Sequence, residues 1–124
     1  MNIFIICPVR NVSDEVRRRI ELYVETLERK GYHVYYPARD TDQTDQVGLN
    51  ICLANLTEIR MAAEVHIWYD PESQGSIFDL GALVMSSLTI GPKKRVVLIN
   101  RHEVLPTNGK SFTNVVLALA EQSA

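Results

Sequence analysis

Residues 3–8 read Ile-Phe-Ile-Ile-Cys-Pro, and the fold class can be inferred starting from this run. An unbroken run of apolar residues closed by proline is typical of a strand buried on both faces, as strands of parallel sheets are. The period then changes, because apolar residues recur every three or four positions between Val16 and Leu27, and Gly31 follows. This spacing predicts a helix that starts near Ser13 and ends before Gly31.

Strands and helices alternate along the rest of the chain. Apolar runs rich in aromatic and β-branched residues predict further strands at residues 32–37, 64–69 and 96–100. Apolar stripes with helical spacing predict further helices at residues 49–63, 76–90 and 111–121. Residues 38–46 are polar and lack a period, which predicts a loop.

The order β-α-β-α-β-α-β-α needs crossover helices and therefore predicts a parallel sheet. We expect a single three-layer α/β domain over residues 1–124, with a flavodoxin-like or Rossmann-like sheet of four to five strands. If the strand order is flavodoxin-like, 2-1-3-4, the strand order reverses between the first and third strands. Ligands of open parallel sheets bind outside the carboxyl ends of the strands at such a reversal. In this sequence the reversal would place residues 7–11 beside residues 70–79.

Composition and charge narrow the function classes. The net charge is −2, so no overall positive field favours a nucleic acid polymer or a membrane surface. Two cysteines and three scattered histidines provide no ligand set for a metal, and we expect none. The chain opens directly on a strand, and no apolar run reaches eighteen residues, which leads us to expect a cytoplasmic protein.

Residues 70–79 concentrate the unusual chemistry. Asp70 follows a strand, a Pro-Glu-Ser-Gln-Gly turn comes next, and Ser76 and Asp79 lie where a helix is expected to start. Free N–H groups and the dipole at a helix start favour an anion such as a phosphate, and they lower the pKa of a first-turn acid. Asp79 is therefore expected to be ionised near neutral pH. The alternatives are that Asp79 only stabilises the helix and that Ser73 and Ser76 only cap it.

The run from Asp70 to Gly81, Asp-Pro-Glu-Ser-Gln-Gly-Ser-Ile-Phe-Asp-Leu-Gly, resembles a known signature. It is similar to the Ser-x-Gly-x-x-x-Glu-Leu-Gly pattern of the nucleoside 2-deoxyribosyltransferase-like family, which includes the 2'-deoxynucleoside 5'-monophosphate N-glycosidases. Residues 3–8 resemble the family's first strand, and residues 59–70 resemble the approach to its site. The resemblance covers most of the first 100 residues, but only the dozen after the third strand are specific.

The resemblance implies residue roles. Asp79 falls where the family has its catalytic glutamate, Ser73 where a substrate phosphate or hydroxyl is held, and Asp70 where a polar residue faces the sugar. Gly75 permits close backbone approach. An aspartate carboxylate lies roughly 1.5 Å further back than that of a glutamate, by one carbon–carbon bond.

Five more residues complete the expected substrate site. Cys7 and Pro8 end the first strand, and Ser76 belongs to the helix start. Arg10 is the candidate partner of a 5'-phosphate, because a guanidinium binds two oxygens at once; a plain surface arginine is the alternative. Tyr69 adjoins Asp70 and is the candidate for stacking on a base, although core packing is the simpler explanation for the aromatic residues of these strands.

The activity implied by the resemblance is cleavage or transfer at the N-glycosidic bond of a nucleoside or nucleoside 5'-monophosphate, with a carboxylate nucleophile and no cofactor. The resemblance also implies a homodimer that completes the site, and the very apolar third helix offers a surface for it. One alternative is a non-catalytic nucleotide-binding or sensing domain. A phosphoacceptor receiver-like domain is a weaker one, since no acidic pair follows the first strand.

Overall fold

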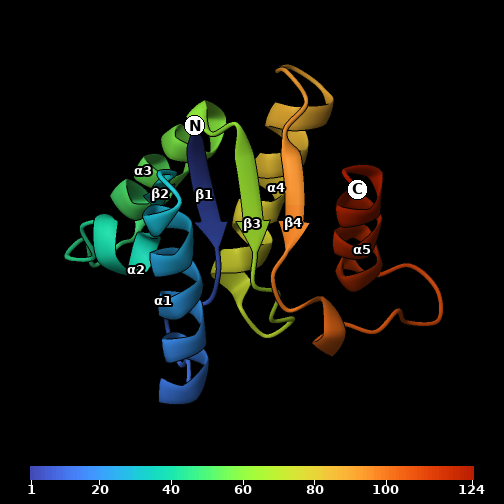
Figure 1. Ribbon diagram of the computed structural model, residues 1–124, viewed down its shortest axis with the longest axis horizontal. Helices are drawn as coiled ribbons and strands as arrows, with labels where there is room; N and C mark the ends of the chain where they lie inside the picture. The colour runs from blue at the N-terminus through green and yellow to red at the C-terminus, as the bar shows by residue number, and fades with distance from the viewer.

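Four parallel strands form one sheet in the computed structural model, which describes residues 1–124 (Figure 1). The strands are β1 (Asn2–Ile6), β2 (His33–Tyr35), β3 (Glu64–Ile67) and β4 (Arg95–Leu98), in the order β2-β1-β3-β4. The register pairs Phe4 with Tyr35 on one side and with Val65 on the other. This confirms the predicted α/β class and the order 2-1-3-4, with four strands.

Six helices connect and flank the strands. They are α1 (Asp14–Arg29), α2 (Pro37–Asp40), α3 (Leu49–Met61), α4 (Gln74–Leu88), the short 3-10 helix η1 (Arg101–Glu103) and α5 (Phe112–Gln122). In Figure 1, α1 lies in front of the sheet and α3 and α4 lie behind it. No helix combines the length and the apolarity that crossing a membrane requires.

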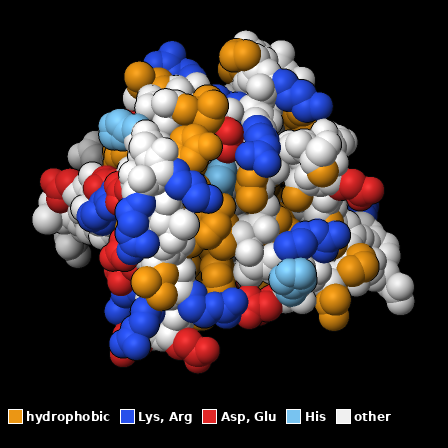
Figure 2. Space-filling view, viewed as in Figure 1, with side chains coloured by type: hydrophobic (Ala, Val, Ile, Leu, Met, Phe, Trp, Pro, Cys, Tyr) orange, Lys and Arg blue, Asp and Glu red, His pale blue; other side chains and the backbone are white.

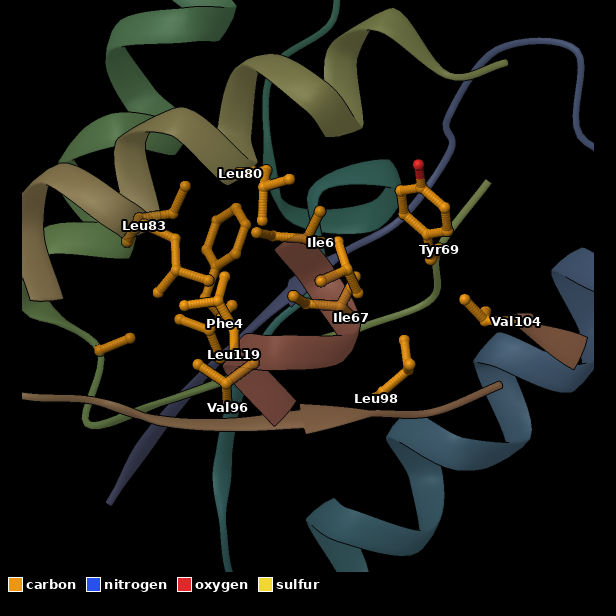
Figure 3. Close-up of a cluster of buried hydrophobic side chains, with 14 residues drawn as sticks. Phe4, Ile6, Ile67, Tyr69, Leu80, Leu83, Val96, Leu98, Val104 and Leu119 are labelled. Atoms are coloured by element: carbon orange, nitrogen blue, oxygen red, sulfur yellow. The ribbon is translucent and has the colours of Figure 1, made fainter. Parts of the chain in front are cut away.

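Alternate residues of β1 enter two separate cores, because successive side chains of a strand point to opposite faces. Phe4 and Ile6 face α3, α4 and α5, where fourteen buried residues pack together, among them Ile67, Leu80 and Leu119 (Figure 3). Burial on both faces explains why the sequence of this strand is apolar throughout rather than alternating.

The opposite face of β1 packs against α1 alone. Ile3 and Ile5 meet the apolar stripe of α1, which includes Ile20 and Val24. Figure 2 shows hydrophobic side chains over the centre of the sheet beside α1, with acidic and basic side chains interspersed around them. The guanidinium of Arg19 covers part of this face, 4.6 Å from the centre of the Trp68 ring.

Two differences between the predicted elements and the structure affect residues of the cleft described below. Residues 37–40 form the short helix α2 across the end of the predicted strand and the start of the predicted loop, because proline fits the first helical position and the Asp40 carboxylate accepts a hydrogen bond from the Tyr36 N–H at 2.9 Å. The third long helix starts at Gln74 rather than near residue 76, because Ser73 caps it. The second difference changes the position of Asp79 within the helix.

Lys94 ties the start of β4 to the end of α3. Its side chain is buried, and its Nζ donates to the carbonyls of Arg60 at 2.8 Å and Ala62 at 2.7 Å. These are carbonyls at the end of a helix, where no further helical N–H follows. The ammonium therefore acts as a cap for α3.

We predict that Lys94→Met lowers the free energy of unfolding by about 2 kcal/mol, because buried carbonyls lose their charged donor. Urea unfolding measures this change. The exposed neighbour Lys93 provides the control, and Lys93→Met should leave stability within about 0.5 kcal/mol of wild type. Equal effects of the two substitutions would contradict the capping role.

Candidate functional site

A cleft opens at the carboxyl edge of the sheet, beyond β1 and β3. Its inner part, the deep cavity, has a volume of about 120 Å³, and its lining includes Cys7, Asn55, Ser73 and Asp79. Its outer part, the outer hollow, has about 880 Å³ and is lined among others by Arg10, Asp70 and Gly75. Five residues line both parts, which makes them one continuous cleft: Gln43, Ile51, Cys52, Ser73 and Gly75.

Asp79 places a desolvated carboxyl group in the deep cavity. The residue is only 7% exposed, and burial alone raises the pKa of its carboxyl to about 7. No group of the chain donates a hydrogen bond to it, and no cation lowers its pKa. A carboxyl with this pKa is present in both protonation states near neutral pH, which suits it to proton transfer or to nucleophilic attack.

The predicted pKa of Asp79 was in the wrong direction. Because α4 starts at Gln74, Asp79 is the sixth helical residue and lies in the second turn, and the first turn holds no acid. The helix dipole acts mainly within the first turn, so desolvation outweighs it. The alternative of a first-turn acid that only stabilises the helix is excluded by the same geometry.

Ser73 and Ser76 form the start of α4. The Ser73 Oγ accepts a hydrogen bond from the Ser76 N–H at 3.2 Å and donates one to the Ser76 Oγ at 2.8 Å. Ser73 therefore caps α4, and Ser76 takes part in the cap, as the alternative interpretation of these two serines predicted. Ser73 also lines both parts of the cleft, whereas Ser76 is buried and lines neither.

The end of β1 contributes one residue to the deep cavity. Cys7 lines it, and burial, with a smaller contribution from the Asp79 charge, raises the pKa of its thiol to about 12. This thiol is therefore protonated and unreactive near neutral pH. Pro8 lies outside the cleft, in a neighbouring hollow on the side of α1.

Arg10 and Asp70 line the outer hollow. Arg10 is exposed and forms no ion pair within the chain, so its guanidinium is free to meet an anion. The Asp70 carboxylate accepts a hydrogen bond from the Glu72 N–H at 2.9 Å and shapes the turn before α4. The two residues share the cleft with Asp79 but not its deep cavity.

Tyr69 does not reach the cleft. Its ring packs in the main core, and its hydroxyl shares a hydrogen bond with the Thr113 hydroxyl at 2.9 Å. The Asn100 side chain accepts from the Tyr69 N–H and donates to the Tyr69 carbonyl, both at 2.9 Å. This double hydrogen bond holds the chain after β3, and Tyr69 helps to fix the loop rather than stacking on a ligand in the cleft.

Val9 and Phe78 belong to the two segments predicted to meet at the site, whereas four other residues of the deep cavity were not predicted from the sequence, namely Pro37, Ile51, Cys52 and Asn55. Gln43, which also lines the cavity, belongs to the polar stretch of residues 38–46 that was predicted only as a loop. Asn55 had a usable signal, since it lies three residues after Cys52 and four before Ile59, on the inward stripe of a helix. A polar residue on such a stripe is unusual enough to indicate a role.

The chemistry available in the cleft follows from these positions. The backbone N–H groups at the start of α4 and the free guanidinium of Arg10 suit an anion in the outer hollow. A ligand that extends from the outer hollow into the deep cavity would meet the carboxyl of Asp79 there. No group of three or more His, Cys, Asp or Glu side chains is arranged to hold a metal ion.

Comparison with protein-family models, curated proteins and solved structures finds no match.

We predict that Asp79→Asn stabilises the protein more as the pH rises. The carboxyl has a higher pKa folded, about 7, than unfolded, 3.8, so its contribution to stability is fully present below pH 3.8 and is lost as the pH rises through 7. At pH 8 the variant should exceed wild type by on the order of 2–4 kcal/mol, and near pH 4 the advantage should vanish.

Urea unfolding of both proteins between pH 4 and pH 8 measures this difference. Asp14→Asn makes the same chemical change at a side chain that is 94% exposed, and its effect should not grow with pH in this way. An Asp79→Asn difference that stays constant over the range would show that Asp79 is not desolvated.

Proposed function

We propose that this protein cleaves or transfers the N-glycosidic bond of a nucleoside or nucleoside 5'-monophosphate, with the Asp79 carboxylate as nucleophile. The observation that carries the proposal is the desolvated carboxyl group of Asp79, without a hydrogen-bond partner, in a cavity that opens into a hollow lined by Arg10 and the start of α4. The resemblance of residues 70–81 to the deoxyribosyltransferase-like family supports the same chemistry. A nucleotide substrate also favours a cytoplasmic location.

The reaction follows from the charges. As the base departs with the bonding electron pair, the anomeric carbon of the sugar becomes cation-like. The ionised Asp79 carboxylate bonds to that carbon and gives a glycosyl-enzyme. The departed base takes up a proton from solvent. Water, or a second base, then attacks the same carbon, loses a proton to solvent and releases the carboxylate, so the protons balance. Desolvation strengthens the interaction between carboxylate and cation-like carbon, because little water competes in the cavity.

The outer hollow would hold the phosphate. Two of the phosphate oxygens can pair with the Arg10 guanidinium, and the N–H groups of Gln74 and Gly75, at the start of α4, have no partner within the chain. Gly75 has open space where a side chain would project, so a ligand can approach its backbone. This arrangement equally suits the alternative, a nucleotide-binding domain that senses without catalysis.

Incubation with a panel of deoxynucleosides, ribonucleosides and their 5'-monophosphates, followed by chromatography for released base, separates the two functions. We expect base release by wild type, loss of at least a hundredfold in Asp79→Ala, and wild-type rates in the control Asp14→Asn. Tight nucleotide binding without release of base would support the sensor. If the protein neither binds a nucleotide nor releases a base, the proposal is contradicted.

The pH profile of the reaction provides a further prediction. Since the nucleophile must be ionised, kcat/KM should rise with pH along an acid limb whose pKa is about 7 and reach a plateau above it. Rate measurements from pH 5 to pH 9 check this. A rate that is already maximal at pH 5 would mean that a group other than Asp79 acts as the nucleophile.

We also propose that two copies of the chain associate through α4. Its outward residues Phe78, Met85 and Leu88 are apolar and exposed, and Asp79, which is buried, is its only charged residue. Phe78 also lines the deep cavity, so a second copy on this face would border the cleft. Met85→Glu should therefore shift sedimentation toward the monomer, and a wild-type monomer at high concentration would contradict the pairing.

A further inference from the structure

Three polar side chains behind the deep cavity form a continuous hydrogen-bonded chain. The Tyr35 hydroxyl lies 2.7 Å from the Thr41 Oγ1, and the Thr41 hydroxyl donates to the Asn55 Oδ1 at 2.8 Å. Tyr35 belongs to β2, Thr41 follows α2, and Asn55 belongs to α3. The end of β2, the residue after α2 and the middle of α3 thus meet, and Asn55 brings this group of hydrogen bonds to the wall of the cavity.

A threonine hydroxyl has a single hydrogen, and this sets the direction of the hydrogen bonds in the series Tyr35, Thr41 and Asn55. Thr41 uses that hydrogen on Asn55, so it must accept the hydrogen of Tyr35. The Tyr35 ring stacks on Phe4 with 5.6 Å between the ring centres, and Thr41 is buried. Both groups are therefore held in place, and the Oδ1 end of the Asn55 amide faces them.

The other end of this amide is free. Asn55 is 9% exposed and lines the deep cavity, and no group of the chain accepts a hydrogen bond from its Nδ2. Asp79 lines the same cavity, and the two side chains form no hydrogen bond with each other. The cavity therefore contains an amide donor and a carboxylate acceptor, each without a partner.

We propose that Tyr35 and Thr41 are positioning residues that hold the Asn55 Nδ2 hydrogens toward the deep cavity, so that a ligand hydroxyl binds between this amide and the Asp79 carboxylate. A hydroxyl fits because it accepts one hydrogen bond and donates another. We identify it as a sugar hydroxyl on the basis of the proposed function. The Asn55 amide selects this group and keeps the sugar against Asp79.

The orientation of the amide can be tested without a ligand by NMR of ¹³C- and ¹⁵N-labelled protein. Thr41→Val keeps the shape and removes the hydroxyl, and Thr41→Ser retains the hydroxyl. We expect the Asn55 Cγ resonance to move upfield in Thr41→Val, since its carbonyl loses a donor, and to stay near the wild-type position in Thr41→Ser. An unchanged Cγ with a shifted Nδ2 resonance would show the reverse orientation and overturn the inference.

Kinetics with the best substrate of the panel test the positioning role. Thr41→Val and Tyr35→Phe should each lower kcat/KM roughly threefold to tenfold, and Thr41→Ser should restore it. In an Asn55→Ala background Thr41→Val should cause no further loss, because Thr41 acts through Asn55. An additive loss would show a merely structural role. If no substrate is cleaved at all, the proposed function fails, while the Cγ comparison still decides the orientation.

Discussion

The desolvation of one carboxyl group is the constraint on which the site depends. Asp79 lies on the inward face of α4, and the position of that face is fixed by the capping of the helix at Ser73 and by the packing of Leu80 and Leu83 on the sheet. Removing the carboxyl from water raises its pKa to about 7 and supplies no compensating hydrogen bond. A group that destabilises the fold whenever it is ionised is more readily explained by function than by structure.

The polar groups of the outer hollow differ from those of the deep cavity. The free N–H groups at the start of α4 and the Arg10 guanidinium border the wide outer hollow, where an anion keeps part of its hydration. The narrow inner part holds Asp79 and the uncharged side chains of Asn55 and Cys7, with no cation. A ligand that is anionic at one end and carries neutral hydroxyls at the other matches this division, and a sugar phosphate has that form.

Much of the fold could be predicted from the sequence, because it depends on periodic burial. The apolar run of residues 3–6 gave the central strand, and the order of elements gave the sheet and the location of the cleft. Less of the site could be predicted. The environment of Asp79 depends on where Ser73 starts the helix, Tyr69 is turned into the core by Thr113, and Asn55 is oriented by Tyr35 and Thr41. The cap at Ser73 is local and was among the alternatives, but the contacts of Tyr69 and Asn55 are tertiary and leave no local signal in the sequence.

The measurement that bears most directly on this account is the pKa of Asp79 in the folded protein, followed through its carboxyl ¹³C resonance by NMR from pH 3 to pH 9. We predict a midpoint near pH 7, where the carboxyls exposed to water have long since ionised. A midpoint near pH 4 would mean that the carboxyl is solvated. Such a result would contradict both the burial of Asp79 in the deep cavity and its proposed role as nucleophile.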